Sequence, residues 1–212
     1  MISSSDILAR MTIKAIIFDL GGVLLRTADF SPRERLAARF GMNRSGLEEL
    51  VFWGESGEKV QSGEISVTEH LEYVRAKLNL SQAEFKELID VFFAEDFLDN
   101  ELLVYVRSLK KNYKTALLSN ATSELREQIA AKWHFEDAFD MMIISGEVGM
   151  IKPDPRIFRL ALDRLGVDAH QAIFVDDVQQ NVDAAVKVGM KGICFRDVNQ
   201  VKLEIEALLQ EG

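Results

Sequence analysis

Four segments of this 212-residue chain carry polar side chains at or soon after an apolar run. The polar residues are Asp19, Ser119 with Asn120, Lys152, and Asp176 with Asp177. A carboxylate at the end of a buried strand can act as a nucleophile, and an ammonium can keep it ionised. Two adjacent acids repel each other unless a cation or hydrogen bonds intervene, and hard oxygen ligands suit magnesium. The residue types therefore predict a polar site that holds a divalent cation.

Each segment taken alone also fits a structural role. Asp19 could begin a turn that Gly21 and Gly22 favour, and Ser-Asn pairs often cap the following helix. The segment around Lys152 is also a helix start, with Asp154 as its cap and a proline at the first helical position. What argues against coincidence is that all four segments occur in order, each at an expected strand end or in the loop that follows it.

The elements that must position these residues follow from hydrophobic patterning. Short apolar runs predict strands, and after about residue 99 they alternate with amphipathic helical patterns. The expected strands are 13–18, 115–119, 141–144, 172–175 and 192–195, and the expected helices are 100–111, 123–133, 155–165, 179–188 and 198–209. Such alternation predicts an α/β fold, a Rossmann-like parallel sheet with helices on both faces, whose ligands bind at the carboxyl ends of the strands.

The stretch 26–98 interrupts this pattern, because it contains helical periodicity and no convincing strand. Helices are expected at 32–40, 45–52, 67–78 and 82–93, the last with a capping-box start at Ser81 and Glu84. We interpret the stretch as an inserted helical-bundle cap, with linkers near 25–30 and 95–99. The predicted organisation is an N-terminal tail (1–12), a core (13–25 and 99–212) and a cap (26–98).

Composition excludes several classes of partner. The net charge of −9 and the lack of a basic run argue against nucleic acid, which needs a basic footprint. No apolar run is long enough to span a bilayer, and the polar N-terminus lacks the apolar centre of a signal peptide, so we expect a cytoplasmic protein without membrane contacts. Cys194 is the single cysteine, and its apolar neighbours predict a buried structural thiol.

Together, the four segments resemble the motifs of the haloacid dehalogenase superfamily, over nearly all of residues 13–196. The resemblance implies that Asp19 is a nucleophile that forms an aspartyl phosphate. It further implies that Ser119, Asn120 and Lys152 bind the phosphoryl group. The implied Mg²⁺ ligands are Asp19, the Gly21 carbonyl, Asp177 and Asp176, the last directly or through water, and Asn181 would support the loop.

The chain departs from the family at Gly21, where the phosphatases usually carry a second aspartate that protonates the leaving group. Losing a general acid–base typically costs roughly 10²–10⁴ in rate. Good leaving groups, as in sugar 1-phosphates and acyl phosphates, would suffer least. The cap residues that could take over the role of the aspartate are Glu55, Glu58, Glu64 and His70. Arg26 and Trp53 are candidates to face the pocket, although Trp53 also fits a core position.

Three interpretations follow. The first is a magnesium-dependent phosphatase of small phosphorylated metabolites such as sugar phosphates, slowed by Gly21. The second is a catalytically impaired binding or regulatory protein that retains the phosphate pocket. The third is a 2-haloacid dehalogenase, against which Asp176 and Asp177 argue, because those enzymes need no metal. The expected partner is a small phosphorylated metabolite, and the sequence leaves open whether the chain is a monomer or a homodimer.

Overall fold

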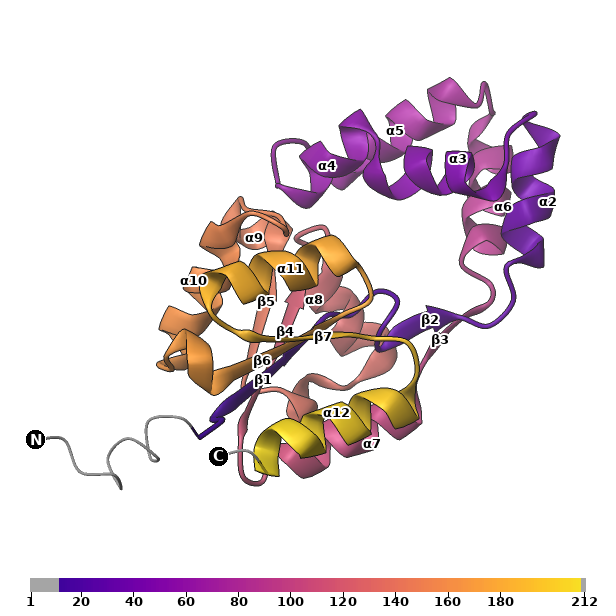
Figure 1. Cartoon of the computed structure of the whole chain (residues 1–212). Helices are drawn as coiled ribbons and strands as arrows, with labels where there is room; N and C mark the ends of the chain where they lie inside the picture. The colour runs from indigo at the N-terminus through magenta and orange to yellow at the C-terminus, as the bar shows by residue number, and fades with distance from the viewer. Residues whose placement is uncertain (1–11, 211–212) are drawn as a thin grey trace, which may run out of the picture.

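A five-stranded parallel sheet forms the centre of the computed structural model, which describes residues 12–210 (Figure 1). Its strands lie in the order β5 (Met141–Ile144), β4 (Lys114–Ser119), β1 (Ala15–Phe18), β6 (Ala172–Asp176) and β7 (Lys191–Cys194). The chain runs outward from β1 to β5 and then returns to the other side of β1 at β6. The direction of winding therefore reverses beside β1, and a ligand binds outside the carboxyl ends at such a switch point.

Helices cover both faces of the sheet, as the alternating pattern predicts. One face packs against α7 (Asn100–Leu109), α8 (Leu125–Gln128), the π-helical turn η2 (Ile129–Trp133) and α12 (Val198–Gln210). The other packs against α10 (Pro155–Leu165) and α11 (Gln179–Val188). Short helical pieces complete the core, namely η3 (Glu136–Ala138), α9 (Ser145–Val148) and η4 (Ala169–Gln171). The predicted α/β fold with a parallel sheet is confirmed, and of the predicted tail only residue 12 lies within the described residues.

The inserted segment forms a separate helical layer beyond the carboxyl ends of the strands (Figure 1). Its elements are α2 (Ser31–Arg39), α3 (Arg44–Glu48), the π-helical turn η1 (Glu49–Trp53), α4 (Glu55–Gln61), α5 (Val67–Lys77) and α6 (Gln82–Phe92). Side chains such as Leu47, Val74 and Leu88 build a hydrophobic cluster of its own. The capping box at Ser81 is present, since Ser81 and Glu84 bond each other's backbone amides. We call this layer the cap and keep the predicted domain bounds as a proposal.

Two short strands connect the cap to the core, whereas the sequence predicts no strand there. β2 (Leu25–Thr27) pairs antiparallel with β3 (Asp96–Leu98), and we call this ribbon the hinge. The expectation of linkers without strands is therefore wrong. A strand of three residues is too short to show a recognisable hydrophobic periodicity. In addition, about 70 residues of chain separate the two strands, so no hairpin signal marks their pairing.

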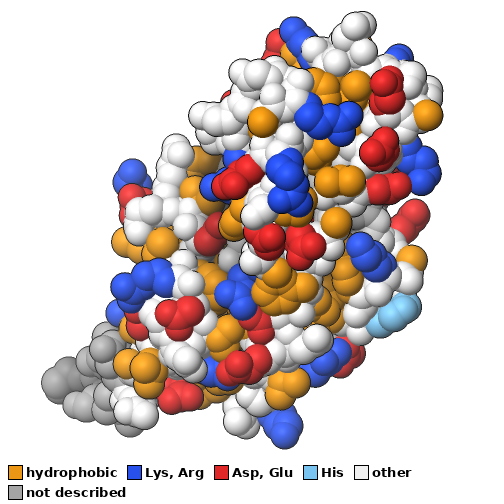
Figure 2. All heavy atoms as spheres, turned by 90° about the vertical axis from the view of Figure 1, so that its right-hand side faces the viewer, with side chains coloured by type: hydrophobic (Ala, Val, Ile, Leu, Met, Phe, Trp, Pro, Cys, Tyr) orange, Lys and Arg blue, Asp and Glu red, His pale blue; other side chains and the backbone are white. Residues whose placement is uncertain are grey.

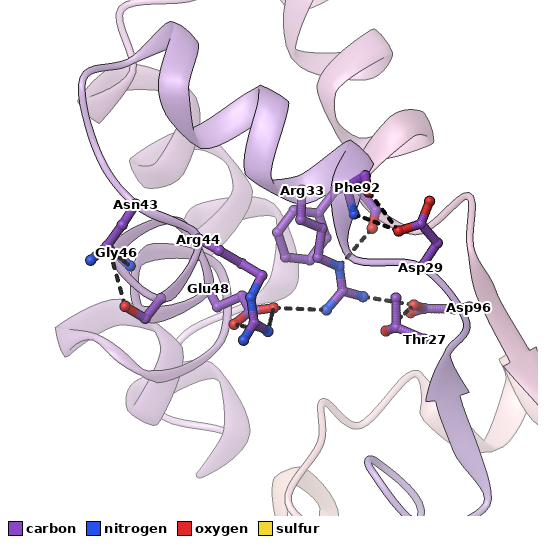
Figure 3. A network of polar contacts seen from close by, with 11 residues as sticks. Thr27, Asp29, Arg33, Asn43, Arg44, Gly46, Glu48, Phe92 and Asp96 are labelled. Carbon is purple, nitrogen blue, oxygen red and sulfur yellow. Dashed lines mark hydrogen bonds and ion pairs between the residues drawn. The ribbon is translucent and has the colours of Figure 1, made fainter.

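Arg33 ties the hinge to the cap (Figure 3). This buried arginine of α2 donates to Asp96 Oδ1 (2.7 Å), Glu48 Oε1 (3.2 Å) and the Phe92 carbonyl (2.9 Å). Thr27 donates to the same Asp96 oxygen from the opposite hinge strand at 2.7 Å. The network thus joins both strands of the hinge to three elements of the cap.

The surface carries no broad field of one charge on the face shown in Figure 2, where basic and acidic side chains alternate over both layers. Over the described residues, no helix combines the length and the apolar character that crossing a bilayer requires. Cys194 ends β7 and is partly exposed, so the expectation of a buried thiol is wrong in degree. Its position at the end of the strand leaves it only partly covered.

Candidate active site

The sheet brings three of the candidate side chains to one edge. Asp19 follows β1 directly, Ser119 is the last residue of β4, and Asp176 is the last residue of β6. Because β1 lies between β4 and β6 in parallel register, these three positions converge at the carboxyl end. All three residues are buried. The apolar runs that precede them favour the inner strands of a parallel sheet, which are buried on both faces, and this places the three residues side by side.

Lys152 lies at the centre of the cluster, and its side chain is 1% exposed. Its Nζ contacts Asp19 Oδ1 at 2.8 Å and Asp176 Oδ2 at 2.7 Å. Burial alone would lower the pKa of Lys152, but the two carboxylates raise it, so the ammonium stays charged. An ammonium bonded to two buried carboxylates is held in a fixed position, from which it can also face an anionic ligand.

Two asparagines hold this arrangement in place. The Asn181 amide donates to both oxygens of Asp176, at 3.2 and 3.1 Å, and the Val178 amide donates to Asp176 Oδ1 at 2.8 Å. Asn120 exchanges two hydrogen bonds with the Lys152 backbone, accepting from its N–H at 2.7 Å and donating to its carbonyl at 2.8 Å. The Asn120 side chain therefore positions the lysine loop, which the sequence does not predict.

Asp19, Asp176 and Asp177 form a candidate metal centre. Each can offer a carboxylate oxygen, and the three atoms lie within 4.8 Å of one another. Burial, opposed by Lys152 and reinforced by Asp176, raises the pKa of Asp19 to about 7. Burial, together with Asp176, raises the pKa of Asp177 to about 6. Three carboxylates against one ammonium leave a formal charge of −2, so hard oxygen donors and charge both fit a magnesium ion.

The two glycines after Asp19 have different surroundings. Gly22 adopts a φ of +73°, and a Cβ there would lie 2.0 Å from Asp177 Oδ2. Only glycine therefore lets this loop approach the Asp177 carboxylate so closely. A Cβ at Gly21 would meet nothing within 4 Å. Position 21, where the resemblance to the family implies an aspartate, therefore has open space around a Cβ.

A cavity of about 630 Å³ lies between the core and the cap. It begins at Ser119 and Asn120 and continues along cap side chains that include Val67, Leu71 and Phe93. Asp19, Lys152, Asp176 and Asp177 are not part of its lining, although Leu20 is. The cavity therefore adjoins the cluster on the side of β4.

The cap residues that the sequence suggests as substitutes for the missing acid do not reach this cavity, except for His70. The Nδ1 of His70 contacts Ser56 Oγ at 2.9 Å, and its Nε2 contacts the Val51 carbonyl at 3.0 Å. Burial lowers the pKa of His70, which favours the neutral imidazole. Both ring nitrogens are already engaged in hydrogen bonds within the cap. Glu55, Glu58 and Glu64 are exposed, outside the cavity lining.

Two further suggestions for pocket residues are corrected. Arg26 pairs with Asp99 in the hinge, and its guanidinium lies over the rings of Phe97 and Phe195, at 5.3 and 5.7 Å from their centroids. Trp53 is 47% exposed, so it lies neither in the core nor in the cavity lining. Arg26 donates to the buried Asp99, which lies more than 70 positions away in the sequence, and no local sequence pattern indicates this pairing.

Comparisons with known proteins agree with this geometry. A hydrolase family model, haloacid dehalogenase-like hydrolase, matches residues 13–189. "Bifunctional epoxide hydrolase 2" of Sus scrofa is 28% identical over 92% of this chain, but the chain spans only 39% of that protein's length. "Phosphorylated carbohydrates phosphatase" of Thermotoga maritima is 26% identical over 92% of this chain and 91% of its own.

A solved structure shares the fold. It is an enzyme of this family from Bacteroides thetaiotaomicron, in complex with magnesium and inorganic phosphate. It superposes with a TM-score of 0.72 at 22% identity, covering 89% of this chain and 98% of that one. The family model spans most of the chain. The chain therefore belongs to the haloacid dehalogenase-like hydrolase family.

Proposed function

We propose that this protein is a Mg²⁺-dependent phosphatase of small phosphorylated compounds that uses Asp19 as its nucleophile. The observation that carries the proposal is the Lys152 ammonium held between Asp19 and Asp176, with Asp177 completing a set of oxygen donors. The relative from Thermotoga maritima, by its name a phosphatase of phosphorylated carbohydrates, supports hydrolysis of phosphate esters.

The residues act on the phosphoryl group in two steps. Asp19 Oδ1 accepts from Lys152 Nζ and from the Leu20 amide at 2.7 Å, which orients the carboxylate and leaves Oδ2 for attack on phosphorus. The new Oδ2–P bond forms as the bond to the leaving oxygen breaks, giving an aspartyl phosphate. Water then attacks that phosphorus, releasing inorganic phosphate and regenerating the carboxylate.

Charge on the phosphoryl oxygens is stabilised by groups already in place. Lys152 supplies a positive charge, and the Ser119 hydroxyl and the Asn120 backbone amide supply hydrogen bonds. Mg²⁺, held by Asp19, Asp176, Asp177 and the Gly21 carbonyl, would supply further positive charge against the same oxygens. Asn181 keeps Asp176 oriented through its two donated hydrogen bonds.

Gly21 decides which leaving groups are favoured. Since it has no proton to give, an alkoxide must leave with a proton taken from water, whereas a carboxylate or a sugar hemiacetal oxygen needs less assistance. We therefore expect acyl phosphates and sugar 1-phosphates to be hydrolysed faster than ordinary alkyl phosphates.

The same glycine favours one alternative, a binding or regulatory protein that holds a phosphorylated ligand without turning it over. A dehalogenase, in which the aspartate would attack carbon, is disfavoured because Asp176 and Asp177 add negative charge that such chemistry does not use.

The test is hydrolysis of acetyl phosphate and glucose 1-phosphate, with Mg²⁺ and with chelator. The wild type is compared with Asp19→Asn and with Asp90→Asn, an exposed cap aspartate, as the matched control. We expect Mg²⁺-dependent release of phosphate that Asp19→Asn abolishes and Asp90→Asn retains. Mg²⁺-dependent binding of phosphate without turnover of either compound would overturn the proposal and favour the binding protein.

A further inference from the structure

The cavity next to the catalytic cluster is lined mainly by hydrocarbon. Thirteen of its twenty-one lining residues are apolar, contributed by the cap, by Leu20, by Leu25 of the hinge, and by the segment 121–133. Among them, Phe93 at the end of α6 and Trp133 at the end of η2 present aromatic rings. A ligand whose phosphate reaches Ser119 would place its organic part against these surfaces.

The polar groups of the cap side are already used within the protein. Both nitrogens of His70 are bonded, Gln61 Nε2 donates to the Phe52 carbonyl at 2.5 Å, and Asp96 is held by Arg33 and Thr27. On the core side, the Asn120 amide is engaged with the lysine loop. Thr122, Gln128 and Lys132 also line the cavity on the core side, and Gln128 and Lys132 are exposed. A sugar placed against the cap would therefore bury hydroxyl groups against side chains whose bonding is committed, and each unpaired hydroxyl costs binding energy.

We propose, building on the phosphatase function above, that the substrates carry an apolar organic group, aliphatic or aromatic, which occupies this cavity. A volume of about 630 Å³ is in the range of pockets that enclose a drug-sized ligand. An acyl phosphate with a hydrocarbon tail meets both requirements of the site, since its carboxylate leaves without a general acid and its tail enters the cavity.

The size of the effect follows from burial of hydrocarbon. Each buried methylene contributes about 0.8 kcal/mol, which corresponds to a factor of about four. Going from acetyl to hexanoyl phosphate adds four methylenes while the leaving group stays a carboxylate. We therefore expect kcat/KM to rise on the order of 10²-fold over the series, until the tail fills the cavity. Glucose 1-phosphate should be a poorer substrate than hexanoyl phosphate.

Two measurements test the inference. The first is kcat/KM for acetyl, butanoyl, hexanoyl and octanoyl phosphate. The second is calorimetric binding of methyl-, butyl- and hexylphosphonate in the presence of Mg²⁺, which requires no turnover. A rise with chain length in both series is the expected result. Flat or falling values in the phosphonate series would overturn the inference, whether or not acetyl phosphate is hydrolysed.

The phosphonate series also separates the two proposals. If tail length strengthens binding but no acyl phosphate is hydrolysed, the phosphatase function fails and the apolar specificity of the cavity stands. If acetyl phosphate is hydrolysed in an Asp19-dependent manner without any gain from longer tails, the phosphatase function stands and the apolar specificity fails.

Matched variants connect the effect to the cavity. Phe93 and Phe97 are 37% and 38% exposed, and only Phe93 lines the cavity. Phe93→Ser should reduce the ratio of hexylphosphonate to methylphosphonate affinity, whereas Phe97→Ser should keep it. Ala131 and Ala130 form a second pair, both exposed, of which only Ala131 lines the cavity. Ala131→Asp should reduce the same ratio and Ala130→Asp should not. Equal ratios within both pairs would contradict the assignment.

Discussion

Restoring a carboxyl group at Gly21 should convert the protein into a faster phosphatase of alkyl phosphates. A Cβ at this position meets nothing within 4 Å, so Gly21→Asp begins its side chain in open space. A positioned general acid–base contributes typically about 10²–10⁴ in rate, or about 2.7–5.4 kcal/mol of barrier. The gain should appear only where the leaving group needs a proton.

The assay compares kcat for hexyl phosphate and hexanoyl phosphate at saturating Mg²⁺. We expect Gly21→Asp to accelerate hexyl phosphate by at least about 10²-fold and to change hexanoyl phosphate by less than about threefold. Gly21→Asn is the matched control, because it has the same shape but cannot donate a carboxyl proton. If Gly21→Asn accelerates hexyl phosphate as much as Gly21→Asp, or if neither does, the reasoning about the missing acid is refuted.

Three further predictions concern the metal centre and the cap. Asn181→Leu removes both amide bonds to Asp176 and should weaken Mg²⁺ binding by about 10- to 100-fold in calorimetry, and an unchanged affinity would contradict the supporting role. In the metal-free fold, burial raises the pKa of Asp19 from 3.8 to about 7 and that of Asp177 from 3.8 to about 6. Between pH 3.8 and these values the folded protein keeps protons that the unfolded chain has released. Its stability should therefore fall as pH rises through this interval. The rise in Tm on adding Mg²⁺ should then be larger at pH 8 than at pH 5.5, and an equal rise would contradict it. Arg33→Met removes the cation that pairs with the partly buried Asp96, while Glu48 keeps Arg44, and should cost about 1.5–3 kcal/mol in denaturant unfolding; a loss below about 0.5 kcal/mol would contradict the hinge network.

Exposed residues of the same type provide the controls for the two substitutions. Asn112→Leu should leave Mg²⁺ affinity unchanged, because Asn112 is exposed and is not among the residues around Asp176. Arg35→Met, on the same helix as Arg33 but exposed, should change stability by no more than about 0.5 kcal/mol.

The central sheet could be predicted because its strands are buried on both faces. A run such as Ile16-Ile17-Phe18 is apolar at every position, and each such run lies within two residues of the observed strand. The positions of Asp19, Ser119 and Asp176 could be predicted for the same reason, since these residues end or directly follow such runs, whereas Lys152 lies in a loop after β5 and α9. The resemblance to the family also pointed to Asn181, whose amide donates to Asp176.

What could not be predicted depends on contacts between distant segments. The partners of Arg26 and Arg33 come from the far side of the insert, and no local pattern marks them. The same holds for His70, which looks like a free cap histidine in the sequence but has both ring nitrogens bonded. The apolar cavity arises only when the cap is placed over Ser119, so its character is a property of the assembled fold.

Trapping the covalent intermediate tests the nucleophile most directly. Acetyl phosphate labelled in the phosphoryl group is mixed with Mg²⁺ and protein, quenched in acid within a single turnover, and the labelled peptide is identified by mass spectrometry. We expect one phosphoryl group on Asp19, absent in Asp19→Asn and present in Asp90→Asn. Turnover without label on Asp19, or label retained in Asp19→Asn, would contradict the assignment of this aspartate as the nucleophile.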